Sequence, residues 1–341
     1  MDRERKVPVI SELETIGLEP VELLTITTLV DNVTDILLLD EGPAIRAPID
    51  SRAPRVPSPL IEGGQTLDAL RAEHGFAALV TISQGGREHR VLFDTGISPD
   101  GLIENMRRLE VSPHDVEVIV LSHGHFDHTT GMDGLIRTLG KANVPVLIHP
   151  EFWSRRRLAL PGREALMLPT TSRSALEGAG FEIIEQQQPS FLLGGSLLVT
   201  GEVDRTSGFE RGMAIHQACR DGQWQPDPLI LDDQALIANV AGKGLVVLTA
   251  CGHAGVVNTV RYARRLTGED RVHAIVGGFH LNGPLFEPII APTCDALAEL
   301  DPDYLVPTHC TGWRAIHALA ARFPNAYLQA SVGTRFEFHS N

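Results

Sequence analysis

Four side chains able to bind metal ions are concentrated in the segment 123–128 (HGHFDH). In an extended loop, residues two positions apart point the same way, so His123 and His125 can hold one ion through imidazole nitrogens. Where the chain turns towards a helix, Asp127 and His128 can face a second ion. Zinc binds such ligands at about 2.0–2.2 Å, and two ions about 3.5–4 Å apart can activate a water between them. The segment therefore predicts a metal-dependent enzyme, in which a second ion would complete a binuclear site.

The alternative is a surface loop that happens to be rich in histidine. The chain has 14 histidines in 341 residues, so three of them within six positions and next to an aspartate are not expected by chance. The apolar, β-branched run at 116–121 (VEVIVL) just before the segment is typical of a strand buried on both faces. A buried strand leading into the segment favours the metal site over the surface loop.

Further ligands are expected from histidines that follow other apolar strands in turns of small residues. His253 and His309 occupy such positions, and His280 is a further candidate ligand or substrate-binding residue. A single histidine in a turn is more often a polar surface residue, but the position shared by all three favours one common site. Cys251 and Cys310 lie beside these histidines, and we interpret them as small buried hydrophobic residues rather than soft metal ligands.

Asp94 ends the strand that precedes the strand leading into the segment 123–128. Its carboxylate could accept a hydrogen bond from His123 or His125 and so orient a metal ligand from behind. The alternative is a local role, as a helix cap or in an Asx-turn with Gly96. The residue types favour neither role over the other.

Buried strands that end in a glycine-flanked histidine, each followed by a helix, recur at 121–139, 246–266 and 305–322. This order of elements predicts one α/β domain over residues 21–341, with sheet layers covered by helices, after an N-terminal arm at 1–20. A Pro-rich loop insertion is expected at about 42–64, with five prolines and three glycines. Other expected elements are strands at 22–29, 35–39, 77–83, 90–94, 144–148, 181–184, 196–200 and 273–276, and helices at 101–109 and 294–300.

Composition limits the partners. The formal net charge of −14 repels phosphate backbones, so we expect no nucleic acid partner. No stretch approaches the roughly 18 uninterrupted apolar residues of a membrane helix, and the charged start lacks the apolar run of a secretory signal. Four widely spaced cysteines do not resemble a disulfide framework. We therefore expect a cytoplasmic protein with a small-molecule substrate and no membrane partner, and homo-oligomer formation stays open.

The segment 123–128, preceded by Asp94-Thr95-Gly96 and followed by Gly131-Met132, resembles the metal signature of the metallo-β-lactamase superfamily. Three later motifs resemble the branch named after 7,8-dihydropterin-6-methyl-4-(β-D-ribofuranosyl)-aminobenzene-5'-phosphate synthase. These motifs are 247–259 (VLTACGHAGVVNT), 277–281 (GGFHL) and 307–312 (PTHCTG). The resemblance spans about residues 22–335.

The resemblance implies a four-layer αββα sandwich with metals at one edge between the two sheets. It implies two divalent metal ions, with zinc expected ahead of manganese or iron. It also implies that His123, His125, Asp127 and His128 are ligands. Superfamily members usually add a later histidine, a bridging aspartate and a final histidine. No Gly-Asp motif occurs where the bridging aspartate is expected, and His253 lies in that region, so it could replace the aspartate.

Three hypotheses for the function follow. The leading one is a metal-dependent hydrolase that acts on a small substrate, which could be anionic, through a metal-activated water that Asp127 would orient. The second is a dihydropterin-linked synthase, which would condense two substrates with release of diphosphate. The third is a ligand-binding protein with a weak or silent metal site, motivated by the missing aspartate motif. His125 in place of the glutamate of flavodiiron oxygen reductases argues against that redox branch.

Overall fold

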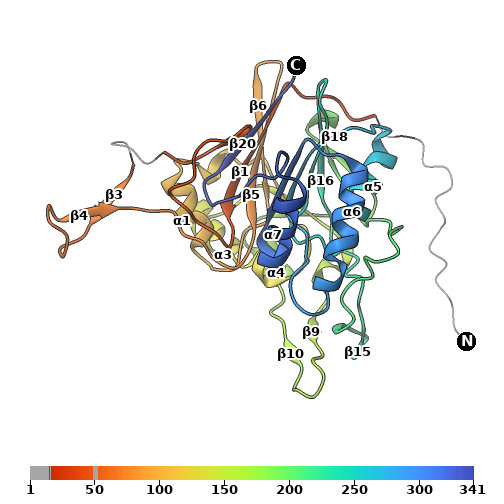
Figure 1. Ribbon diagram of the computed structural model, residues 1–341. Coiled ribbons are helices and arrows are strands. Elements are labelled where there is room, and N and C mark those ends of the chain that lie inside the picture. The colour runs from red at the N-terminus through yellow and green to blue at the C-terminus, as the bar shows by residue number, and fades with distance from the viewer. Residues whose placement is uncertain (1–14, 16, 49–52) are drawn as a thin grey trace, which may run out of the picture.

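The computed structural model describes residues 15, 17–48 and 53–341, in which two large sheets face each other between layers of helices (Figure 1). Most of the predicted arm at 1–20 lies outside the described residues. The first large sheet has eight strands in the order β11-β8-β7-β6-β5-β1-β20-β2. Its strands are β1 (Leu23–Val30), β2 (Ala44–Ile45), β5 (Ala77–Gln84), β6 (Arg87–Phe93), β7 (Val118–Val120), β8 (Pro145–Ile148), β11 (Glu182–Glu185) and β20 (Arg335–His339).

The second large sheet has six strands in the order β12-β13-β16-β17-β18-β19. Its strands are β12 (Ser190–Leu192), β13 (Leu197–Val199), β16 (Leu236–Val240), β17 (Gly244–Leu248), β18 (Val272–Gly278) and β19 (Tyr304–Thr308). The run β17-β18-β19 is parallel, as is β6-β7-β8 in the first sheet. Parallel strands end at the same edge of a sheet, so the turns that follow them are brought together there.

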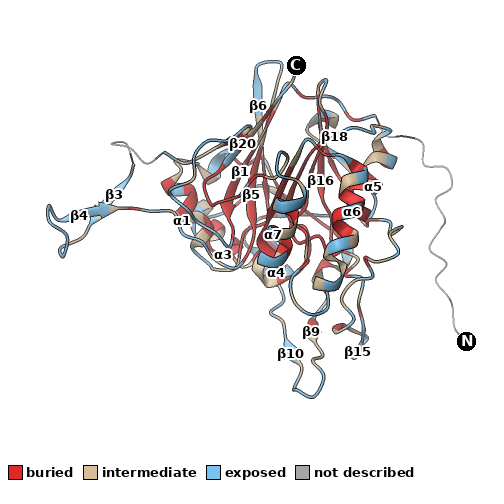
Figure 2. Cartoon of the chain, viewed as in Figure 1, coloured by how far each residue is buried: buried red, intermediate tan, exposed pale blue. Residues whose placement is uncertain are grey.

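Helices cover the outer face of each large sheet. On the first sheet, α1 (Gly101–Arg108), α3 (Met132–Leu139) and α4 (Arg173–Gly178) share one buried cluster with the sheet, which includes Leu102, Met106 and Leu135. On the second, α5 (Val256–Thr267), α6 (Ile290–Leu300) and α7 (Trp313–Arg322) share another. Figure 2 shows the strands buried and these helices exposed on their outer sides, the pattern of amphipathic helices on a sheet. The expected four-layer αββα sandwich is confirmed.

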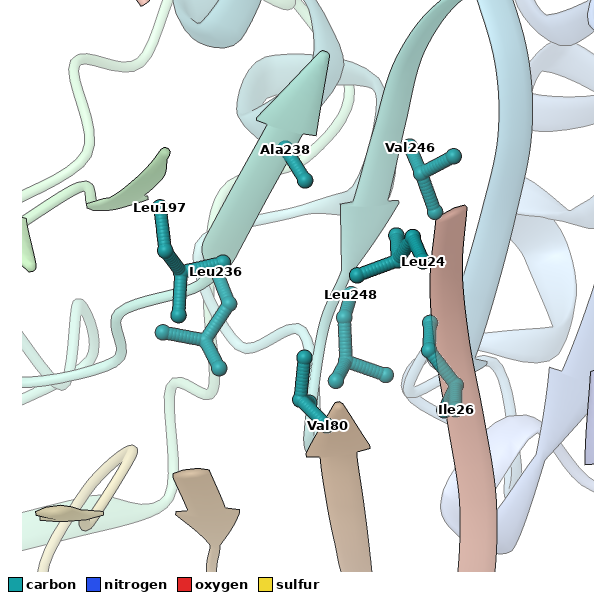
Figure 3. Close-up of a pocket in the computed structure, with 8 residues that line it drawn as sticks. All are labelled: Leu24, Ile26, Val80, Leu197, Leu236, Ala238, Val246 and Leu248. Atoms are coloured by element: carbon teal, nitrogen blue, oxygen red, sulfur yellow. The ribbon is translucent and has the colours of Figure 1, made fainter. Parts of the chain in front are cut away.

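The inner faces of the two sheets pack into a third apolar cluster. Side chains from both sheets point towards each other there and leave a cavity of only about 10 Å³ (Figure 3). The residues lining it are Leu24, Ile26, Val80, Leu197, Leu236, Ala238, Val246 and Leu248. An entirely aliphatic lining can hold the sheets in register but offers no polar group for chemistry.

Smaller elements lie outside the two sheets. A four-stranded sheet in the order β10-β9-β14-β15 and the hairpin β3–β4 both project from the body (Figure 1). The hairpin begins inside the predicted insertion 42–64, of which residues 49–52 lie outside the described part. Bounds are β3 (Arg55–Pro57), β4 (Gln65–Leu67), β9 (Arg156–Leu158), β10 (Leu166–Met167), β14 (His216–Arg220), β15 (Gln223–Pro226), and the short helices α2 (Phe126–Thr129), η1 (Pro113–Asp115), η2 (Pro150–Trp153), η3 (Leu193–Gly195), η4 (Glu287–Ile289) and η5 (His309–Thr311).

One predicted strand is wrong. Residues 35–39 form a turn and irregular chain, and Leu37 and Leu39 are largely exposed. The run is apolar, but it pairs with no strand among the described residues, so its backbone lies outside the sheets. Within the described residues, no helix combines the length and the apolar character needed to cross a membrane.

Candidate metal centre

The ends of two runs of parallel strands, β6-β7 in the first sheet and β17-β18-β19 in the second, deliver the predicted metal-binding side chains to one edge of the sandwich. Asp94 follows β6, the segment 123–128 follows β7, and the turns after β17, β18 and β19 carry the later histidines. Three of these strand-end residues have the positive φ that side chains other than glycine rarely adopt. The values are 59° for Asp94, 45° for His280 and 45° for His309. Backbone held in such regions is concentrated at functional sites, where surrounding packing maintains it.

His123, His125 and His253 form the first group of ligand atoms. The His125 Nδ1 atom lies 3.0 Å from His123 Nε2 and 3.2 Å from His253 Nε2. Two nitrogens on one tetrahedral zinc ion would be about 3.4 Å apart, so this convergence suits one ion. Burial, reinforced by neighbouring histidines and, for His123 and His125, by Arg156, holds the pKa of all three imidazoles well below the usual value. They are therefore neutral near pH 7 and have lone pairs to offer a metal.

Asp127, His128 and His309 form the second group. Asp127 Oδ2 lies 3.3 Å from His309 Nε2 and 3.7 Å from His128 Nε2. Both Nε2 atoms are buried without a hydrogen-bond partner among the described residues, which is costly unless an ion or water binds there. Burial opposes ionisation of Asp127, but His128 and His309 hold its pKa below the usual range. These donors fit a divalent metal ion.

A proton can occupy the Nε2 atom of His128 in place of a metal ion. Burial lowers the pKa of His128, but Asp127 and Asp94 outweigh burial and raise the pKa to about 9. A metal ion at Nε2 would displace this proton, so metal uptake by the second group is expected to release protons.

Cys251 lies between the two groups. Its Sγ, with one nitrogen each from His123 and His253, forms a set whose atoms all lie within 4.8 Å of one another, and it forms a second such set with His128 and His309. The Cys310 Sγ is 3.2 Å away. Both cysteines are buried, as predicted, but Cys251 Sγ contacts His280 and Cys310 rather than apolar side chains alone.

Hydrogen bonds from behind orient the histidines. Asp94 accepts bonds of 2.7 Å from Ser122 N, Ser122 Oγ and His128 Nδ1. Ser122 Oγ in turn accepts from His123 Nδ1 at 2.8 Å. Asp94 thus contacts His128 directly and His123 through Ser122, whereas the sequence suggested direct contact with His123 or His125. Metal-binding histidines commonly have such an acceptor on the second ring nitrogen.

Asn32 and Asp31 hold His309 in the same manner. Asn32 Oδ1 lies 3.1 Å from His309 Nδ1, and Asp31 accepts the His309 backbone N–H at 2.8 Å. These bonds direct the free Nε2 of His309 towards Asp127.

Two adjacent aspartates tie the metal-binding turns together. Asp232 accepts from the backbone N–H of Gly124 at 2.8 Å and is paired with the buried Arg156. Asp233 accepts from the backbone N–H of Ala254 at 2.8 Å. A Cβ atom at Gly124 would lie 2.2 Å from the Phe152 carbonyl oxygen, so only glycine fits this turn.

His280 lies beside the centre. Its Nδ1 is 3.3 Å from Cys251 Sγ, and its ring centroid is 4.2 Å from that of His253. It is only partly buried, so it borders the opening of the site rather than its interior. This placement is compatible with either of its predicted roles, ligand or substrate contact.

The sequence did not reveal two further histidines at the site. His216 Nε2 lies 2.9 Å from His125 Nε2, and the exposed His74 places Nε2 3.6 Å from Asp127 Oδ2. Neither follows a buried strand in a turn of small residues, so the pattern that identified the others did not include them. The structure otherwise brings every predicted ligand into one cluster; their roles as ligands remain predictions.

Comparison with known proteins agrees with this architecture. The sequence model of the metallo-beta-lactamase superfamily matches residues 71–188. A 7,8-dihydropterin-6-methyl-4-(beta-D-ribofuranosyl)-aminobenzene-5'-phosphate synthase from Methanocaldococcus jannaschii is 28% identical over 78% of this chain and 90% of its own. An uncharacterized protein of the same organism is 31% identical over 77% of this chain and 92% of its own.

Among solved structures, one similar fold is that of a metal-dependent hydrolase of the beta-lactamase superfamily. It superposes with a TM-score of 0.68 at 22% identity and covers 93% of this chain and 100% of its own. At this identity the likeness concerns the fold.

Proposed function

Because the chain belongs to the metallo-beta-lactamase superfamily, we propose that it is a metal-dependent hydrolase of a small molecule, with two divalent ions, zinc foremost, at one centre. The observation that carries the proposal is the pair of ligand groups side by side at the sheet edge. In one, three neutral imidazoles converge; in the other, two buried Nε2 atoms without partners face a carboxylate. Such donor sets cost free energy unless a cation completes them.

Each group has a distinct role in this proposal. His123, His125 and His253 hold one ion, and Asp127, His128 and His309 hold the other. Two ions bound there would supply an activated water and polarise the bond under attack. The Asp127 carboxylate would accept a hydrogen bond from the water and orient it. His74, exposed beside Asp127, would contact an anionic group of the substrate.

Metal analysis combined with a substrate panel tests this proposal. The purified protein, loaded with Zn²⁺ or Mn²⁺, is assayed for bound metal and against carboxylic esters, amides and phosphodiesters. His125→Ala should lose bound metal and turnover together. His114→Ala, which alters an exposed histidine outside the site, is the matched control and should retain both. Absence of bound metal, with unchanged turnover in His125→Ala, would contradict the proposal.

A second candidate is a dihydropterin-linked synthase, favoured by the name of the 28% identical relative. Its test is incubation with a hydroxymethyl-dihydropterin diphosphate and a phosphorylated arylamine riboside, with detection of diphosphate release. Release that depends on both substrates and on His125 supports this candidate, and no product with any metal form excludes it. Tight retention of a ligand without turnover in a metal-loaded sample would instead favour a binding protein with a silent site.

A further inference from the structure

We propose that the Cys251 thiolate bridges the two metal ions, in place of the aspartate that superfamily members usually supply. The inference rests on the proposed metal-dependent function and adds to it the identity of the shared ligand. Among the described residues, Cys251 is the only one that belongs both to the set with His123 and His253 and to the set with His128 and His309.

The distances are compatible with direct coordination. Zinc binds thiolate sulfur at about 2.3 Å and imidazole nitrogen at about 2.0–2.1 Å, so the two atoms would be about 3.6 Å apart on one tetrahedral ion. All ligand atoms of each set lie within 4.8 Å of one another. Side-chain adjustments of at most about 1 Å would therefore bring Cys251 Sγ and the four histidine nitrogens to the distances that two tetrahedral ions require.

The other candidates for a bridge face away from the space between the groups. The Asp233 Oδ1 atom lies 4.0 Å from Nδ1 of His123, the ring nitrogen opposite the one that converges on His125. Asp94 likewise contacts Nδ1 of His128 from behind. His253 approaches His123 and His125, but it shares no ligand set with the second group.

The turn after β17 holds Cys251 in this place. Cys251 is 3% exposed, and its carbonyl oxygen accepts a bond from Cys310 Sγ at 3.1 Å. Gly252 follows with φ of +70°, and a Cβ there would lie 2.6 Å from the Gly278 carbonyl oxygen. The tight turn against β18 therefore fixes the direction of the Cys251 side chain.

Substitution with cobalt tests the bridge through a spectrum rather than through activity. Reduced protein loaded with Co²⁺ should bind two ions per chain and show a sulfur-to-cobalt charge-transfer band in the near ultraviolet. Cys251→Ser should lose the band and bind at least one ion at least tenfold more weakly. Cys251→Asp should bind two ions without the band. Cys294→Ser, at a buried cysteine on α6, is the matched control and should keep both the band and the ions.

The outcomes separate this inference from the proposed function. If the wild-type protein binds two ions and hydrolyses a substrate without showing the band, the bridge is wrong but the proposed function stands. The same conclusion follows if the band persists in Cys251→Ser or is lost in Cys310→Ser. A wild-type protein that binds no metal overturns both. Circular dichroism and thermal unfolding establish that each variant is folded. If Cys251→Ser does not fold, the other two measurements test the bridge. A wild-type band and two ions in Cys251→Asp without the band support it, and the absence of either result contradicts it.

Discussion

The Nε2 atoms of His125 and His216 lie 2.9 Å apart in the protein interior. His216 Nδ1 is 3.0 Å from the carbonyl oxygen of Asp227, so this nitrogen carries a proton, and in the neutral ring His216 Nε2 is then an acceptor. His125 must then donate from Nε2, which leaves the lone pair on its Nδ1, the atom that faces His123 and His253. One contact between histidines thus selects the tautomer required for metal binding.

His216→Ala is expected to weaken metal binding by about 10–100-fold, the usual effect of losing a partner that orients a metal-binding histidine. His216→Gln, whose side-chain oxygen can still accept the His125 proton, should lose less. Titration against a chromogenic chelator measures both affinities. Equal affinities in wild type and His216→Ala would show that His125 is oriented by other contacts.

Asp94→Asn is expected to reduce both stability and metal affinity. The carboxylate accepts three hydrogen bonds, and an amide nitrogen would face the donors Ser122 Oγ and His128 Nδ1. A buried unsatisfied donor costs about 1–3 kcal/mol, so the free energy of unfolding should fall by about 2–4 kcal/mol. Urea unfolding of metal-free protein measures this loss.

The control for Asp94 is Asp115→Asn, which breaks an exposed pair with Arg90. It should change the free energy of unfolding by less than about 1 kcal/mol. Similar losses in the two variants would mean that the Asp94 network contributes little.

The sequence predicted those site residues that a local sequence pattern marks. His123, His253 and His309 each follow an apolar strand in a turn of small residues, and both features can be read within a dozen positions. The order of strands that brings these turns together depends on contacts between distant parts of the chain. The alternation of strands and helices in the sequence limits which orders are possible.

The features that the sequence did not reveal depend on long-range packing. His216 reaches His125 because the small sheet of β9, β10, β14 and β15 places it there, and nothing adjacent to His216 marks that position. Cys251 was interpreted as a small buried hydrophobic residue because its polar neighbours come from other strands. Residues 35–39 had the composition of a strand without a partner strand to pair with.

Metal binding should stabilise the fold, because the ions complete donors that are otherwise left without partners. A ligand present at 100 times its dissociation constant adds about 2.7 kcal/mol to the free energy of unfolding. Zn²⁺ should therefore raise the melting temperature by several degrees, and a chelator should reverse the shift. In His309→Ala the shift should be smaller. Identical melting curves with Zn²⁺ and with chelator would argue against an ordered metal centre.

Glu210 should make stability depend on pH. Its side chain accepts the backbone N–H groups of Val257 and Asn258 at 2.9 Å each, at the start of α5. Burial raises its pKa from 4.5 to about 7, although those two hydrogen bonds lower it. The folded protein therefore holds this proton more tightly than the unfolded chain. The stabilisation is fully present below about pH 4.5 and is lost as the pH rises through about 7.

Glu210→Gln removes this titration while keeping the size of the side chain and one acceptor oxygen. Between pH 5 and pH 8 the wild-type free energy of unfolding should fall relative to that of the variant, by on the order of 2–3 kcal/mol. Other buried acids titrate in both proteins, so the difference between the two pH profiles isolates Glu210. Urea unfolding at several pH values supplies these profiles. Parallel profiles would show that the Glu210 proton is held equally in the folded and unfolded states, and that the helix start tolerates the buried charge.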